Sequence, residues 1–120
     1  MKKMKASKRF RIYKEMRREL IAKYPDAFPV KGKRPPLKVG IIKDILEDGA
    51  VTNGANNIRI FLSIWTRSTA YLQGVAKKRP RVTINGEICG EISDNHASEA
   101  AQIILFRKNK KANKLTSLSQ

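Results

Sequence analysis

The sequence predicts an α+β fold that is mostly α-helical, with about five helices and one small β-hairpin. Apolar residues recur at spacings of three and four over most of the chain, as in helices that bury one face. The pair Asn85-Gly86 separates two short strand-like stretches and tolerates the positive φ angles of a type I′ turn. A chain of 120 residues suits one domain and is too short for two ordinary ones.

The first predicted helix begins at Ser7, whose hydroxyl can cap it, and ends near Tyr24, before Pro25. Residues 25–36 form a loop, since four of the five prolines lie there and restrict the backbone. One face of the helix is apolar and the opposite face is basic. The apolar face comprises Phe10, Tyr13, Met16, Leu20 and Tyr24, and the basic face includes Arg11, Lys14 and Arg18.

Three shorter helices follow the loop. Residues 37–47 form the second helix, which stops near Gly49. The third begins at one of three possible caps, and a short fourth covers residues 68–73 and ends at Gly74. The possible caps are Thr52, Asn53 and Asn56. The inward-facing residues are Val39, Ile42, Ile45 and Leu46 in the second helix and Ile58, Phe61, Leu62 and Trp65 in the third.

Residues 81–92 are predicted to form the hairpin, and a last helix follows it. Ser93 or Asp94 can cap this helix, which ends in the basic stretch RKNKK. Its inward-facing residues are Ala97, Ala100, Ala101, Ile104 and Leu105. We therefore expect one domain over residues 1–108, followed by a loose polar and basic tail over residues 109–120.

Charge is the strongest indication of function. The 26 lysine and arginine residues outnumber the 10 aspartate and glutamate residues, which gives a net charge of +16 and a sequence pI near 10.4. Residues 1–38 have a net charge of +11, residues 39–75 are neutral and residues 76–120 have a net charge of +5. Such a chain attracts polyanions, so nucleic acid is the first expected partner and an anionic membrane surface the second.

The composition argues against several other classes of protein. No apolar run reaches the roughly 18 residues of a membrane span, and the cationic N-terminus lacks the apolar stretch of a secretory signal. With Cys89 as the only cysteine, these features favour a cytoplasmic protein that does not enter membranes. His96 is the only histidine, so a zinc site lacks ligands, and no spacing of acids, serines and histidine indicates a catalytic site. We expect no enzymatic activity, cofactor, metal or small-molecule substrate.

The basic cluster Lys77-Lys78-Arg79-Pro80-Arg81 is the most specific candidate site. Its proline can hold the neighbouring cations in fixed positions beside the hairpin. Tyr71 lies ten residues before Arg81, and the two could flank one nucleotide, since RNA bases stack on aromatic rings and arginine planes. Tyr71 could equally belong to the core. The lysines near both ends of the chain are as consistent with a solvated surface as with phosphate contacts.

Three motifs, in this order along the chain, resemble the ProQ/FinO domain of bacterial RNA chaperones. They are YPDAFPVKGKRPPLKVGIIKDI at residues 24–45, TAYLQGV at residues 69–75 and RVTINGEICGEISDNH at residues 81–96. The resemblance extends from about Phe10 to Arg107 and implies a mostly helical domain with a concave and a convex face. It also implies binding of small RNAs and messenger 3′ ends, at the lower stem and U-rich 3′ tail of terminator hairpins. Members of the family stabilise such RNAs and can promote RNA–RNA pairing.

The resemblance further implies which residues bind RNA. Tyr71 and Arg81 match a tyrosine and an arginine of the concave pocket. Lys38 matches a lysine of the proline-flanked segment, and Arg59 matches a basic position on the third helix. Thr66, Arg67 and Ser68 match a helix start whose backbone N–H groups face the terminal nucleotide. The charge of the neighbouring segments adds Arg11, Lys14, Arg18, Lys33, Arg34, Lys77, Lys78 and Arg79 to the expected RNA-binding residues.

The sequence departs from the family pattern at three positions. Ser63 stands where relatives commonly carry an arginine, Ala55 where a lysine is often found, and Ala70 where the residue beside the tyrosine is polar or basic. These departures affect the contacts expected with the RNA stem. They leave the residues expected to capture the 3′ end unchanged.

Two other functions are compatible with the charge. The third and fourth helices could form a helix-turn-helix that binds double-stranded DNA, with Asn57 and Arg59 at base edges, although the third helix is mostly apolar. The chain could also be a ribosome-associated interaction module. We expect structured RNA as the partner of a monomeric domain, because a small chain of high net charge repels copies of itself.

Overall fold

The computed structural model describes residues 5–52 and 54–118 and has the predicted fold class. The helices are α1 (Ala6–Lys23), α2 (Ile41–Asp48), α3 (Ala55–Trp65), α4 (Thr69–Ala76) and α5 (Asp94–Leu118). Strands β1 (Arg81–Val82) and β2 (Ile88–Gly90) form a two-stranded antiparallel sheet. The prediction of a mostly helical α+β fold with one small hairpin is therefore confirmed.

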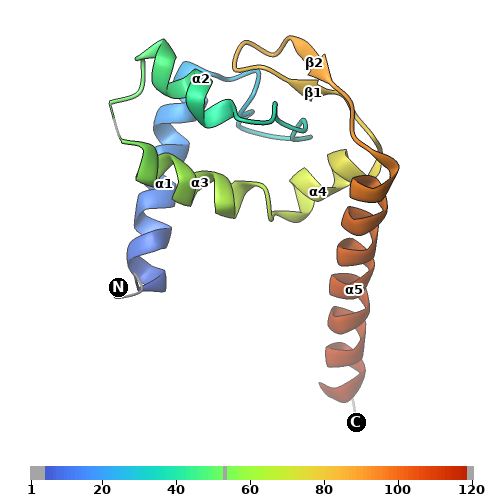
Figure 1. Ribbon diagram of the computed structural model, residues 1–120. Coiled ribbons are helices and arrows are strands. Elements are labelled where there is room, and N and C mark those ends of the chain that lie inside the picture. The colour runs from blue at the N-terminus through green and yellow to red at the C-terminus, as the bar shows by residue number, and fades with distance from the viewer. Residues whose placement is uncertain (1–4, 53, 119–120) are drawn as a thin grey trace.

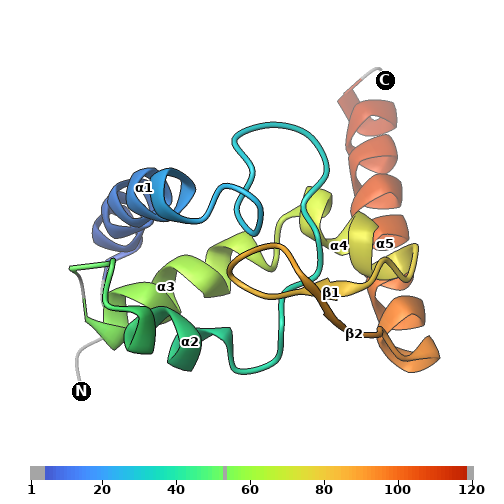
Figure 2. The same cartoon turned by 90° about the horizontal axis from the view of Figure 1, so that it is seen from above.

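The helices are arranged as an arch (Figure 1). α3 and α4 follow one another across the middle of the molecule, below α2 and the hairpin. α1 packs against α3 at one end and α5 packs against α4 at the other. Both outer helices extend to the same side, and α5 continues well beyond the body of the molecule. Seen from above, the loop between α1 and α2 passes beside α3 and α4 and leads to the hairpin side (Figure 2).

Three aromatic side chains form the centre of the core. Phe61 and Trp65 lie one helical turn apart on α3, and Phe28 meets both rings edge-on, with centroids 5.5 Å away in each case. All three side chains are fully buried. Because Phe28 belongs to the proline-containing loop, this loop closes over α3 and contributes to the core instead of remaining a surface connection.

The end of the same loop is fixed by backbone pairing. Leu37 forms a parallel bridge with Val82 of β1, and the N–H of Lys38 donates to the carbonyl of Val82 at 2.9 Å. Gly40 then adopts a positive φ of 80° and precedes α2. The prediction that the second helix begins at residue 37 is therefore wrong, because residues 37 and 38 pair with a strand.

The turn of the hairpin and the role of Gly74 in α4 also differ from expectation. Gly86 has a positive φ of 83° whereas Asn85 does not, so the turn is not type I′. Its N–H donates to the carbonyl of Thr83 at 2.9 Å, as in longer loops that end with a left-handed glycine. α4 continues through Gly74, where an added Cβ would lie 2.7 Å from the carbonyl oxygen of Arg34. This glycine permits the loop to pass close to α4 and does not end the helix.

Four further predictions of helix boundaries and burial need correction. α1 begins at Ala6 with Lys5 before it, and Ser7 does not cap it. The residue that precedes α3 is Gly54; Thr52 and Asn56 do not cap it, and Asn53 lies outside the described residues.

Residues 109–118, expected to be a loose tail, continue α5, because they contain good helix formers and no glycine or proline. Five side chains expected to face inward are exposed, namely Phe10, Val39, Leu46, Ala101 and Leu105.

No helix within residues 5–52 and 54–118 combines the length and the apolar character that crossing a bilayer would require.

Candidate nucleic-acid interface

The junction between α3 and α4 is organised by one hydroxyl. Ser68 precedes α4 in extended conformation, and its Oγ accepts the N–H of Tyr71 at 3.2 Å, so it caps the helix. The same Oγ donates to the carbonyl of Trp65 at 2.7 Å, which ties the cap to the end of α3. It also accepts a hydrogen bond from Nη1 of Arg34 at 3.0 Å. Ser68 therefore joins the two helices and the proline-containing loop.

The backbone N–H groups at this junction are not those that the sequence suggested. Thr66, Arg67 and Ser68 donate their N–H groups to carbonyls of the last turn of α3, at 2.9, 3.3 and 3.2 Å. Since α4 begins at Thr69, the prediction that residues 66–68 present unpaired donors is wrong. Within the described chain, no hydrogen bond is formed by the N–H of Thr69 or Ala70, the first two residues of α4. These two donors lie at the positive end of the helix dipole and can receive an anion.

Tyr71 and Arg81 meet at one residue of the loop, Leu37, although ten residues separate them in sequence. The N–H of Leu37 donates to the Tyr71 hydroxyl at 3.0 Å, and Nη1 of Arg81 donates to the Leu37 carbonyl at 2.7 Å. Tyr71 is only 7% exposed, so its ring belongs to the core and offers no open face for stacking. Its hydroxyl proton has no acceptor among the described residues.

Arg34 is held against the core at the edge of the same site. Its guanidinium lies 3.6 Å from the centroid of the Trp65 ring, while Nη1 bonds to Ser68. Stacking fixes the plane of the guanidinium and leaves most of its five N–H donors free for a ligand. The sequence marked Arg34 only as one cation of a loop, because nothing in its spacing indicates contact with a tryptophan 31 residues later.

Comparison with known proteins identifies this arrangement. The chain matches the ProQ/FINO family over residues 10–116. It belongs to that family. A crystal structure of NMB1681 from Neisseria meningitidis MC58, described as a FinO-like RNA chaperone, superposes with a TM-score of 0.63 at 22% identity, covering 76% of this chain and 92% of the other. The solution structure of a ProQ homologue from Legionella pneumophila gives a TM-score of 0.61 at 25% identity, covering 90% of this chain and 89% of the homologue. As a member of the ProQ/FINO family, the protein is not an enzyme.

The basic cluster at residues 77–81 of this ProQ/FinO domain does not form one patch. Lys77 borders a groove between α4 and α5, and Arg79 borders a different groove with Lys33 and three loop prolines. Lys78 donates to Asp94 at 2.5 Å. This hydrogen bond, with the attraction between the charges, raises the pKa of Lys78 and lowers that of Asp94. Only Arg81 turns toward Tyr71, so the cluster supplies the proposed pocket with one cation.

Lys38, the lysine of the proline-flanked segment, is paired within the protein. Its Nζ donates to Asp44 of α2 at 2.7 Å. The hydrogen bond to this carboxylate and its negative charge raise the pKa of Lys38. The ammonium therefore remains charged, but Asp44 offsets part of its attraction for phosphate.

The basic residues of α1 and α3 lie outside the junction. Lys14 and Arg18 border a groove with Arg17 and Val30, whereas Arg11 is exposed elsewhere on α1. Arg59 is exposed on α3, where it donates to Asn56 at 3.3 Å. These residues can provide additional phosphate contacts on the arch but are not part of the pocket.

Arg9 is a residue that the sequence analysis missed. Its Nη2 donates to Oγ of Ser63 at 3.0 Å across the interface of α1 and α3. Ser63 is the position where relatives commonly carry an arginine, so α1 brings a guanidinium to the site that α3 lacks. The only sequence signal was a basic residue one turn before Tyr13, which packs on Phe61 with centroids 5.3 Å apart.

Proposed function

We propose that this domain captures the 3′ end of structured RNA, as found at a terminator hairpin followed by a U-rich tail. The observation that carries the proposal is the convergence of uncommitted donors at the start of α4. The N–H groups of Thr69 and Ala70, the guanidinium of Arg34 and the hydroxyl of Tyr71 all belong to segments joined by hydrogen bonds through Ser68 and Leu37.

Each group has a distinct task in this proposal. The N–H groups of Thr69 and Ala70 bind the last phosphate, with the helix dipole favouring the negative charge. Tyr71 donates its hydroxyl proton to the terminal nucleotide, and Arg34 provides a charge-assisted hydrogen bond to the backbone. Arg81 holds the carbonyl of Leu37 in place and thereby helps to position the Leu37 N–H that binds the Tyr71 hydroxyl.

The stem is held by cations spread over the arch. Arg9, Arg11, Lys14 and Arg18 of α1, Arg59 of α3 and Lys33 of the loop are placed to contact phosphates along the duplex. Such contacts recognise the shape and charge of the duplex and not its sequence. Capture of an RNA end in this manner would protect the end from exonucleases and support pairing with a second RNA.

Family membership favours this function over the two alternatives left by the sequence. In a helix-turn-helix of α3 and α4, α4 would be the exposed recognition helix, but α5 packs against α4 and the carbonyl of Arg34 passes close to its Gly74. The similarity to a FinO-like RNA chaperone supports RNA as the partner rather than duplex DNA or a ribosomal protein.

The test compares one hairpin in three forms: with its uridine tail and a free 3′ hydroxyl, with the tail trimmed, and with a 3′ phosphate. We expect tightest binding to the free hydroxyl in a gel-shift titration. A 3′ phosphate adds negative charge, so weaker binding of that form cannot arise from general attraction to a basic protein. Equal affinity for all three forms would refute end capture.

A further inference from the structure

The projecting helix α5 carries an exposed aromatic side chain that the core does not use. Phe106 is 68% exposed, and no other ring or cation among the described residues contacts it. The exposed Phe10 differs, because it stacks on Tyr13 and lies under the ammonium of Lys14. Phe106 thus has a free π face in a helix that is otherwise strongly basic at this point.

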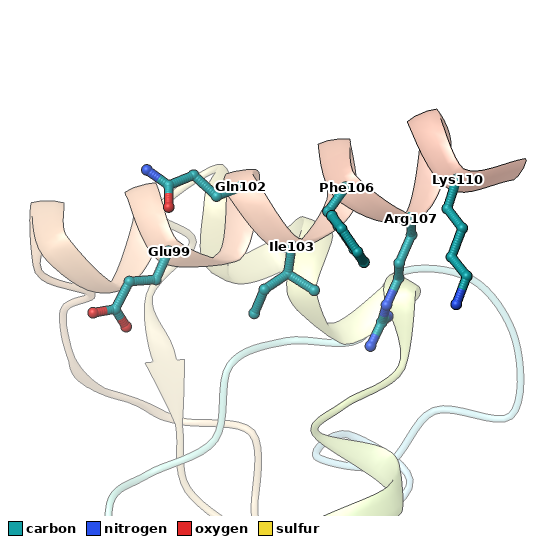
Figure 3. A pocket seen from close by; sticks show the side chains of 6 residues that line it. All are labelled: Glu99, Gln102, Ile103, Phe106, Arg107 and Lys110. Carbon is teal, nitrogen blue, oxygen red and sulfur yellow. The ribbon is translucent and has the colours of Figure 1, made fainter. Parts of the chain in front are cut away.

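A groove of about 760 Å³ runs along this face of α5. Its walls are formed by Glu99, Gln102, Ile103, Phe106, Arg107 and Lys110. Figure 3 shows the side chains of Ile103, Phe106 and Arg107 pointing from α5 to the same side of the helix.

Arg107 connects the groove to the start of α4. Its Nη1 donates to Oγ1 of Thr69 at 3.1 Å. Thr69 is also the first of the two residues whose backbone N–H groups are free. The groove is therefore continuous with the site proposed above for the last phosphate of the RNA.

We propose that the α5 groove binds single-stranded nucleotides that immediately precede the 3′ end, with one base stacked on Phe106. This inference rests on the proposed function and extends it to the tail. Arg107 and Lys110 bind the phosphates of these nucleotides, and Ile103 supports the base beside the ring. Single-stranded nucleic acid is commonly bound in this manner, by cations that follow the backbone and aromatic rings that stack the bases.

The charge of the groove favours RNA over a protein partner. Arg107 and Lys110 are the cations of the groove, with Lys108 and Lys111 beside them in the chain, and Glu99 is the one carboxylate among the groove residues. Glu99 lies two helical turns before Arg107, away from the contact of Arg107 with Thr69. A second copy of this chain would bring the same cations to the interface, where they repel.

The experiment measures the affinity of variants at residue 106 for a hairpin with a long uridine tail and for the same hairpin with its tail trimmed to the last nucleotide. We expect Phe106→Ala to weaken binding of the long tail about ten-fold, the loss typical of one stacked base, and to leave the trimmed hairpin unaffected. Phe106→Tyr retains a π face and should bind as the wild type, whereas Phe106→Leu should not. Leu105→Ala is the matched control, since Leu105 is 56% exposed and borders the other groove of α5.

A photo-crosslinking measurement locates the tail independently of affinity. A 4-thiouridine placed near the 3′ end should crosslink to a peptide that contains Phe106, as identified by mass spectrometry. If the wild type prefers long tails but crosslinks elsewhere and Phe106→Ala has no effect, the proposed function stands and the α5 site is wrong. If Phe106→Ala changes the mass of the protein in solution and not its RNA affinity, α5 binds a second copy instead and the proposal is overturned. Loss of end preference in the wild type itself would refute the proposed function.

Discussion

Tyr71 and Arg81 act mainly by holding the backbone of the proline-containing loop. Tyr71 and Arg81 were expected to flank a nucleotide, but both bind the backbone of Leu37, Tyr71 at its N–H and Arg81 at its carbonyl. Their contribution to RNA binding is therefore to order the loop beside α4. The ring of Tyr71 is core, and its hydroxyl accepts the N–H of Leu37.

Replacement of Arg81 tests this positioning role. Arg81→Ala is expected to weaken binding of a tailed terminator hairpin by about 1–3 kcal/mol, the range for a lost hydrogen bond of a charged group. Arg81→Lys keeps the charge but loses the rigid planar fork, so it should recover little of the affinity. Gel shifts give the affinities. Unchanged binding by Arg81→Ala would show that Leu37 needs no such support.

Arg9 provides a second test at this scale, because it brings a guanidinium to Ser63. We expect Arg9→Ala to weaken hairpin binding by about 1 kcal/mol and to reduce the salt dependence by about one phosphate contact. The double variant Arg9→Ala with Ser63→Arg should regain the affinity, since the guanidinium then arises from α3. If Ser63→Arg does not restore binding, Arg9 does not take the place of an arginine at position 63.

Among the elements, α4 matters most, because its first turn combines a cap and an anion site. Ser68→Asn should retain the cap and the stability of the domain, since asparagine and aspartate cap helices as well as serine. Ser68→Asp should be equally stable but should bind RNA at least ten-fold more weakly, because a carboxylate repels phosphate and pairs with Arg34. Thermal unfolding and gel shifts separate the two effects. Equal RNA binding by both variants would place the last phosphate away from α4.

Elements with a strong local signal could be predicted from the sequence, and those decided by distant contacts could not. The apolar stripe of α3 and the Asn85-Gly86 turn region were located correctly, since spacing and turn residues depend on near neighbours. The start of α2 was misplaced because residues 37 and 38 pair with β1, 44 residues away. The free N–H groups were predicted about three residues too early for a similar reason. The N–H groups of residues 66–68 already donate to carbonyls at the end of α3. The stack of Arg34 on Trp65 has no local signal at all.

At the scale of the whole molecule, charge determines how strongly any RNA is held. With the net charge of +16 distributed over an arch, we expect contact with about six phosphates. Log affinity should then fall against log salt concentration with a slope of roughly −4 to −5. Titrations over a range of salt concentrations provide the slope. A slope near zero would contradict binding through phosphates.

The arch also explains why charge alone does not describe the function. General attraction would act equally on every part of an RNA, whereas the uncommitted donors gather at one point, between α3 and α4. A directional site of this kind distinguishes the two ends of a strand. The cations of α1, α3 and the loop then add affinity without changing that preference.

The most direct measurement compares a duplex with a uridine overhang at its 3′ end and the same duplex with an equal overhang at its 5′ end. The two RNAs have the same length, charge and single-stranded content and differ only in which end is free. We expect the 3′ overhang to bind at least ten-fold more tightly in a competition assay. Equal competition by the 5′ overhang would contradict it.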